Sequence, residues 1–207
     1  MSDEDTQNFI SLRSSAQMIC ENLNYAINTV LFGRVIFPPK SFKVNIQYGI
    51  TLFILEDPIV KAFLDRLLRQ IEEWIVQKKV FKLSLVIRKQ ENNEVVECWD
   101  FNIYYENGEP SLHKIKNKNI GRKDKQKIEE EIKDFMIQVD NMMACLPFKF
   151  CQCYFNILVH VNKDIQLPKN WMEVENLDVS NPKTITYDKT ISTSLHKLET
   201  NVSCTKN

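Results

Sequence analysis

The spacing of the apolar residues constrains the fold of this chain more than any other feature. In three stretches, at about 12–31, 58–75 and 128–143, they recur three and four residues apart, which is the period of an amphipathic helix. Elsewhere they alternate, over 81–87, 99–103 and 151–161, as expected for strands with one buried face. Three helices and an antiparallel hairpin predict an α+β fold, with the helices on one face of a sheet.

Local signals place the boundaries of these elements. Asp57 is a good helix N-cap, and Pro58 suits the first helical position. Ser14 and Gln17 have the spacing of a capping box near the start of the first helix. Residues 91–94 read as a hairpin turn between two strands.

Residues 162–207 differ from the rest of the chain. They are rich in threonine and serine, and short alternating pieces such as Ile185 and Tyr187 favour strand without fixing a register. We therefore expect one domain over 1–207, with a core at about 9–161 and a strand-prone tail at about 162–207.

Charge and composition argue against several classes of protein. Lysine plus arginine and aspartate plus glutamate both number 27, so the net charge is zero, which speaks against a dedicated nucleic-acid binder or a polybasic membrane protein. No apolar run approaches the roughly 18 residues of a transmembrane helix. The acidic start, with Asp3 to Asp5, is unlike a secretory signal. The expectation is a soluble intracellular protein that binds neither membrane nor nucleic acid, and the basic run at 111–127 is expected to be a solvated loop.

Motifs for catalysis, cofactors and metals are missing from the sequence. The glycines form no phosphate-binding loop, and His113, His160 and His196 are far apart. Six cysteines scattered along the chain indicate thiols in a reducing compartment, and Cys151 and Cys153 lack the partners of a zinc site. We expect no enzyme, no cofactor and no metal; a thiol enzyme built on Cys151 or Cys153 is the remaining catalytic alternative.

Four segments carry a resemblance to the HORMA-domain family, and in particular to its spindle-checkpoint members. They are LRSSAQMICENLNYAINTVLFGRVIFPPKSF at 12–42, KLSLVIRKQENNEVVECWDFNI at 82–103, LPFKFCQCYFNILVHVNKDIQLPKNW at 146–171 and SLHKLETNV at 194–202. They follow the family order from about residue 9 to 203. The resemblance implies three helices packed on a central antiparallel sheet, with a mobile C-terminal safety belt that covers the sheet edge in one state and wraps a partner peptide in another.

The resemblance also implies partners and a role. The partner peptides would come from mitotic arrest deficient protein one or from the anaphase-promoting-complex activator, cell division cycle protein twenty. The protein would join the mitotic checkpoint complex in the nucleus, at kinetochores and in the cytoplasm, and would hold the ubiquitin ligase inactive. The nearest alternative is a HORMA adaptor of DNA repair or meiosis, of the polymerase zeta type.

The resemblance implies site residues by their matching positions. A partner peptide would pair with the strand 151–161 and meet Trp74, Cys153, Phe155, Ile157, Val159, Trp171 and His196. For Trp74, plain core filling is an equally good interpretation. Lys163 and Asp164 match the hinge of the belt. Ile137 stands where the family has an arginine that pairs two conformers, while its neighbour Gln138 matches, so we expect at most a weak homodimer.

Overall fold

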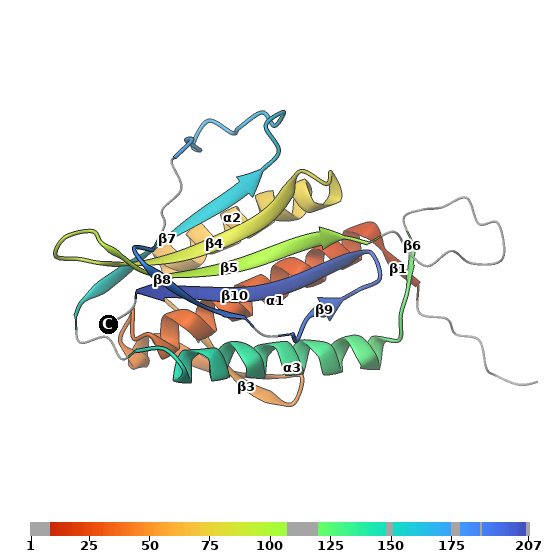
Figure 1. Cartoon of the computed structure of the whole chain (residues 1–207). Coiled ribbons are helices and arrows are strands. Elements are labelled where there is room, and N and C mark those ends of the chain that lie inside the picture. The colour runs from red at the N-terminus through yellow and green to blue at the C-terminus, as the bar shows by residue number, and fades with distance from the viewer. Residues whose placement is uncertain (1–8, 107–119, 148–150, 175–178, 187, 206–207) are drawn as a thin grey trace, which may run out of the picture.

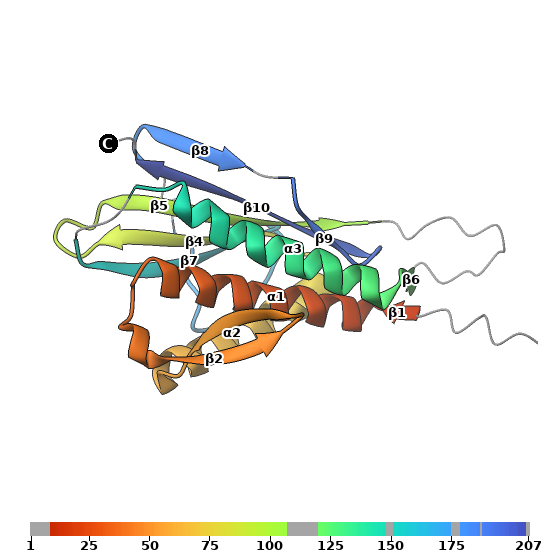
Figure 2. The same cartoon turned by 90° about the horizontal axis from the view of Figure 1, so that it is seen from below.

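The computed structural model describes residues 9–106, 120–147, 151–174, 179–186 and 188–205. Three helices cover one face of an antiparallel sheet whose strands lie in the order β7-β4-β5-β10-β8, with β9 paired to β10 (Figures 1 and 2). The helices are α1 (Leu12–Gly33), α2 (Pro58–Val76) and α3 (Lys125–Ala144). The strands are β1 (Phe9–Ser11), β2 (Phe42–Gln47), β3 (Ile50–Leu55), β4 (Val80–Lys89), β5 (Val95–Tyr105), β6 (Ile120–Arg122), β7 (Cys153–Val161), β8 (Pro182–Thr186), β9 (Ile191–Ser192) and β10 (His196–Thr205). The expected α+β architecture is confirmed.

The helices begin where polar side chains satisfy backbone N–H groups. Asp57 caps α2 as expected, because its Oδ1 accepts from the N–H groups of Ile59 and Val60 at 3.0 and 3.1 Å. The capping box expected at Ser14 is wrong. Ser11 is the N-cap of α1, and its Oγ accepts from the N–H of Ser14 at 3.0 Å. None of the helices within the described ranges is long and apolar enough to cross a membrane.

A buried ion pair ties α1 to the sheet. Nη2 of Arg34, the residue after α1, lies 2.5 Å from Oε1 of Glu97 in β5, and the two side chains are 7% and 0% exposed. Nη2 of Arg34 also donates to the carbonyl oxygen of Pro147 at 2.8 Å, and the indole N–H of Trp99 donates to Oε2 of Glu97 at 3.2 Å. Since neither charge reaches water, each depends on the other for its stabilisation.

The C-terminal strand β10 lies inside the sheet rather than outside the core. It pairs antiparallel with β5, from His196 opposite Tyr105 to Cys204 opposite Glu97, and its other side pairs with β8 and β9. Every second side chain of β10, from His196 to Cys204, is buried. Part of the expected tail therefore completes the core. At the opposite edge, β7 pairs with β4 and with no other described strand (Figure 1).

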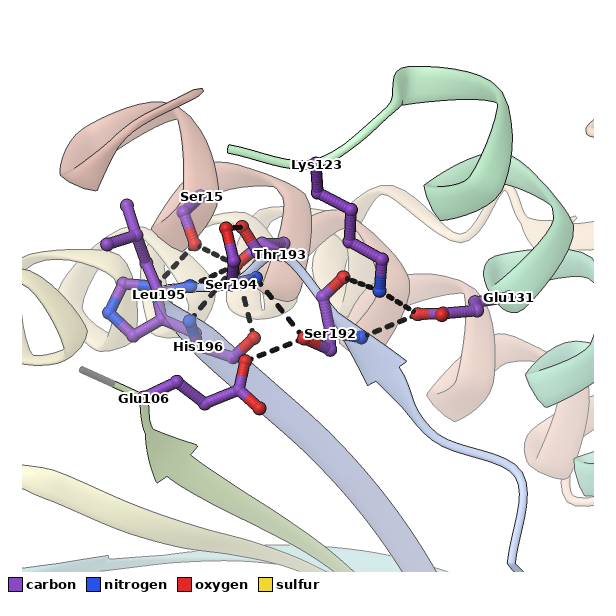
Figure 3. A network of polar contacts seen from close by, with 9 residues as sticks. All are labelled: Ser15, Glu106, Lys123, Glu131, Ser192, Thr193, Ser194, Leu195 and His196. Atoms are coloured by element: carbon purple, nitrogen blue, oxygen red, sulfur yellow. Dashed lines mark hydrogen bonds and ion pairs between the residues drawn. The ribbon is translucent and has the colours of Figure 1, made fainter. Parts of the chain in front are cut away.

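A polar network fixes the chain just before β10 (Figure 3). The hydroxyl of Ser15 in α1 lies 2.5 Å from both Thr193 Oγ1 and His196 Nδ1, and all three residues are buried. Ser192 joins the network through its N–H, which donates to Glu131 of α3 at 3.0 Å. The start of β10 is thus held by α1 on one side and by α3 on the other.

The rest of this network connects the basic run, which was expected to be a solvated loop, with the C-terminal tail. Lys123, from the basic run, lies 2.6 Å from Oε2 of Glu131 and donates to the carbonyl oxygen of Ser192 at 2.7 Å. The hydroxyl of Ser192 donates to Glu106 at 2.6 Å. Lys123 is therefore engaged within the fold, whereas residues 111–119 of the basic run lie outside the described residues.

Replacing Arg34 by alanine should destabilise the protein by about 3–5 kcal/mol, because it removes the cation that faces the buried Glu97 carboxylate at 2.5 Å. Urea denaturation followed by circular dichroism measures this loss. Arg13→Ala is the matched control. Arg13 faces Glu72 at 3.9 Å with its own side chain 85% exposed, so its removal should cost less than about 1 kcal/mol. Equal losses for the two variants would contradict the role given to the buried pair.

Mild acid should destabilise the protein through His196. Burial, followed by the positive charge of Lys78, lowers the pKa of His196 from 6.5 to about 4. The folded state therefore keeps the imidazole neutral, and its contribution is complete above pH 6.5 and declines as the pH falls toward 4. Between pH 7 and 5 the free energy of unfolding should fall by about 2 kcal/mol.

One variant isolates this effect. His196→Asn should flatten the pH dependence between 7 and 5, because asparagine has no group that titrates in this range. The measurement is urea denaturation at a series of pH values. A wild-type slope that survives in His196→Asn would assign the effect to another group.

Candidate functional site

A groove runs along the unpaired edge of β7. The segment 162–174 leaves the end of β7 and arches back beyond that edge (Figure 1). Two adjoining hollows, of about 530 and 710 Å³, lie between the segment and the strand. Both are lined by Ile157 and Leu158 of β7 and by Trp171, Met172 and Val174 of the segment, so they form one continuous groove.

Two tryptophans close the groove on the side of the helices. Trp74, near the end of α2, is 4% exposed and belongs to the core, and it also lines the groove. The ring of Trp171 meets it edge to face, with centroids 4.8 Å apart. Trp74 therefore fills the core, while its contact with a partner peptide stays a prediction. The contact attaches the arch to α2 through an aromatic pair.

The apolar face of β7 points toward the helices. Cys153, Phe155, Ile157 and Val159 lie opposite Lys89, Ile87, Leu85 and Leu83 of β4, and all four are half-buried against the core. Ile157 and Val159 also line the groove, whereas Cys153 and Phe155 lie nearer the start of the strand. The ring of Phe155 packs edge to face on Phe37, with centroids 6.1 Å apart. One end of the apolar face of β7 therefore lines the groove.

The expected hinge lies directly after β7. Backbone hydrogen bonds hold Asn162 to Lys79 at 2.9 Å and Ile165 to Asn162 at 3.3 Å. Lys163 and Asp164 form the turn between these anchors, with both side chains exposed, and Lys163 lines the groove. These two residues begin the arch, and their function as a hinge stays a prediction.

Three of the expected site residues lie away from the groove. His196 is buried in the network of β10 (Figure 3), and β4 and β5 lie between β10 and β7 in the sheet. On α3, Ile137 is 41% exposed, while Gln138 is 4% exposed. The Gln138 amide donates to the carbonyl oxygen of Lys189 at 3.2 Å and accepts from its N–H at 2.8 Å. In this conformer Gln138 therefore binds the protein's own segment ahead of β9.

Several residues that line the groove carry no signal of that role in the sequence. They come from α2 and from the neighbouring strand, and they are Phe63, Arg66, Leu67 and Arg88. Phe63 is 39% exposed although it continues the apolar stripe of α2. A large exposed aromatic side chain such as Phe63 is the best indication of this surface. It can be recognised only when the positions of α2 that face the core are known.

The polar cluster nearest the groove does not have the geometry of a catalytic triad. The hydroxyl of Ser84 donates to Asp100 at 2.5 Å and lies 3.0 Å from Nε2 of His160. The serine stands between the acid and the histidine, whereas a triad needs the histidine in the middle. Cys153 and His160 lie at opposite ends of β7. Within the described ranges, no group of three histidine, cysteine or acidic side chains is arranged to hold a metal ion.

Comparisons with known proteins agree with this architecture. The HORMA domain family model matches residues 15–203. The chain is 30% identical over 202 residues to the mitotic spindle checkpoint component mad2 of Schizosaccharomyces pombe, covering 98% of this chain and 97% of that protein. It is 31% identical over 198 residues to the mitotic spindle checkpoint protein MAD2 of Arabidopsis thaliana, covering 95% and 91%.

A solved structure shares both fold and sequence with the chain. A chain in the crystal structure of the mitotic checkpoint complex matches with a TM-score of 0.81 and 29% identity, over 93% of this chain and 99% of that one. The alternative of a HORMA adaptor for DNA repair or meiosis is not favoured, since these relatives carry spindle-checkpoint names. The chain therefore belongs to the HORMA-domain family, as a spindle-checkpoint protein of the MAD2 kind.

Proposed function

We propose that the groove captures an extended segment of a partner protein as an additional strand beside β7. The observation that carries this proposal is the edge of β7, which pairs with β4 alone among the described strands and faces a groove roofed by 162–174. A free edge offers a row of backbone N–H and C=O groups, which give affinity to any extended chain. Pockets beside the edge, here lined by Trp74 and Trp171, select the side chains.

The partners that fit this proposal are mitotic arrest deficient protein one and cell division cycle protein twenty. The similarity to a chain of the mitotic checkpoint complex supports them. By seizing the activator, the protein would keep the anaphase-promoting complex inactive without any catalytic step. We expect it in the nucleus, at kinetochores and in the cytoplasm, where such partners act.

The arrangement of the C-terminal strands supports a belt that moves. With β10 paired to β5, the edge of β7 is open to a partner, and 162–174 lies outside it. An extended partner segment cannot enter this groove sideways unless the arch at 162–174 is displaced. We therefore expect the C-terminal strands to leave β5 while a partner segment enters and then to pair with β5 again. This step breaks and re-forms backbone hydrogen bonds.

Self-association through α3 should be weak. The exposed Ile137 supplies no charged donor, and the amide of Gln138 is occupied by Lys189. At these two positions, any homodimer would therefore lack a charged hydrogen bond.

Partner binding should be slow, because strand exchange precedes capture. The association rate should lie well below the roughly 10⁵ M⁻¹s⁻¹ that ordinary docking reaches. Stopped-flow mixing with fluorescent peptides, tiled along the two proposed partners, measures it. A binding peptide that associates at or above that rate would show that the belt need not move.

Replacing Trp171 by alanine should weaken retention of a captured peptide at least tenfold, because it removes the aromatic contact that attaches the arch to α2. The melting temperature should change little, since Trp171 is only half-buried. Fluorescence anisotropy and thermal melting on the same sample give both values.

Phe81→Ala is the control for that experiment. Phe81 is 47% exposed on β4 and does not line the groove, so its loss removes an aromatic ring from the surface outside the groove. It should leave peptide binding unchanged. Full retention by Trp171→Ala, or an equal loss in the control, would argue against the groove as the binding site.

A further inference from the structure

The groove is charged differently along its length. Toward the hinge, its lining includes Lys163 and Glu173, which have opposite charges. Around residues 156–158 of β7, the described lining includes Arg66 and Arg88 and no carboxylate. One stretch of the groove is therefore positive, and it adjoins the apolar surface of Ile157 and Trp171.

The two arginines approach this stretch from opposite faces of the sheet. Arg66 is exposed on α2, which packs on the covered face. Arg88 follows Ile87 in β4, and because Ile87 is buried against the helices, Arg88 points to the other face. There its guanidinium carbon lies 5.9 Å from the centre of the Tyr154 ring.

Neither guanidinium is neutralised by a carboxylate of the residues that the structure describes. Nε of Arg88 donates to the backbone oxygen of Asn93 at 2.8 Å, which leaves the other N–H groups of Arg88 for a ligand. Across the described part of the chain, the ion pairs involve other cations, and Arg66 and Arg88 form none. Two cations beside an apolar groove repel a basic ligand and attract an acidic one.

The side chains of an added strand would alternate between the two faces. Of two consecutive residues passing 156–158, one would point toward Arg66 and the next toward Arg88. We propose that the partner segments held in this groove carry an acidic side chain within that two-residue stretch, flanked by apolar residues. This inference rests on the proposed capture of a strand by β7 and adds to it the charge that the partner must carry.

Peptide selection from a random library tests the inference without assuming which partner is bound. Displayed 12-residue random peptides are incubated for many hours with the full-length protein, so that slow loading is not limiting, and the retained sequences are aligned. The same selection uses Arg66→Glu/Arg88→Glu and, as a control, Arg69→Glu. Arg69 is exposed on the same helix but does not line the groove.

The wild-type protein and the control should select apolar residues together with aspartate or glutamate at a fixed position. The double variant should lose that preference and select lysine or arginine there. A selected synthetic peptide with glutamate changed to glutamine should bind the wild-type protein about threefold or more weakly. If the double variant is poorly folded by circular dichroism, Arg66→Gln and Arg88→Gln replace it, and the acidic preference should weaken in each.

Three results would overturn the inference, and the third is distinguishable from the first two. A shared apolar pattern without any acidic preference, or an acidic preference that persists in the arginine variants, refutes the charge requirement and leaves strand capture intact. If the wild-type protein selects no shared pattern at all, the proposed function fails, and the inference fails with it.

Discussion

The pairing of β10 with β5 is the interaction on which the rest of the structure depends. It gives the inner strand β5 its second neighbour and brings the buried side chains Leu198 and Val202 into the core. It also takes the C-terminal strands to the edge of the sheet remote from β7. The groove and its open edge exist because this ladder is formed on the other side.

The core face of β10 is unusually polar for an inner strand. It carries His196 and Thr200 between its apolar residues, whereas the matching face of β4 presents Leu83, Leu85 and Ile87. The Oγ1 atom of Thr200 is buried and without a hydrogen bond among the described atoms. Such a strand gains less from burial than an aliphatic one, because each unsatisfied hydroxyl costs free energy. Specific polar contacts with Ser15 and Thr193 provide part of its attachment, and this composition agrees with the proposed detachment of the strand.

The sequence was sufficient for the elements whose burial depends on apolar residues alone. The three helical stripes, the start of α2 at Pro58 and the alternation in β4, β5 and β7 all appear in the structure. The register of β10 was not predictable, because histidine and threonine interrupt its buried face. The hairpin of β2 and β3 was also missed, since its exposed Val44 and Ile46 obscure the alternation of apolar and polar residues.

In the site, Arg66 and Arg88 come from different elements, so no local pattern in the sequence joins them. Conversely, His196 matched the family by position but lies two strands from the groove.

The course of the chain around β7 also has a mechanical consequence. Residues 162–174 lie outside the strand, Val179 packs against Val86 and Val95, on the face of the sheet that the helices leave open, and β8 lies at the far edge. If a partner segment is held in the groove as proposed, residues 162–174 cross outside it, and the same chain returns at Val179 on the open face of the sheet. A sideways pull on that segment would then load the backbone ladder between β10 and β5 as well as the contacts in the groove. Resistance to such a pull would depend in part on a strand at the opposite side of the sheet.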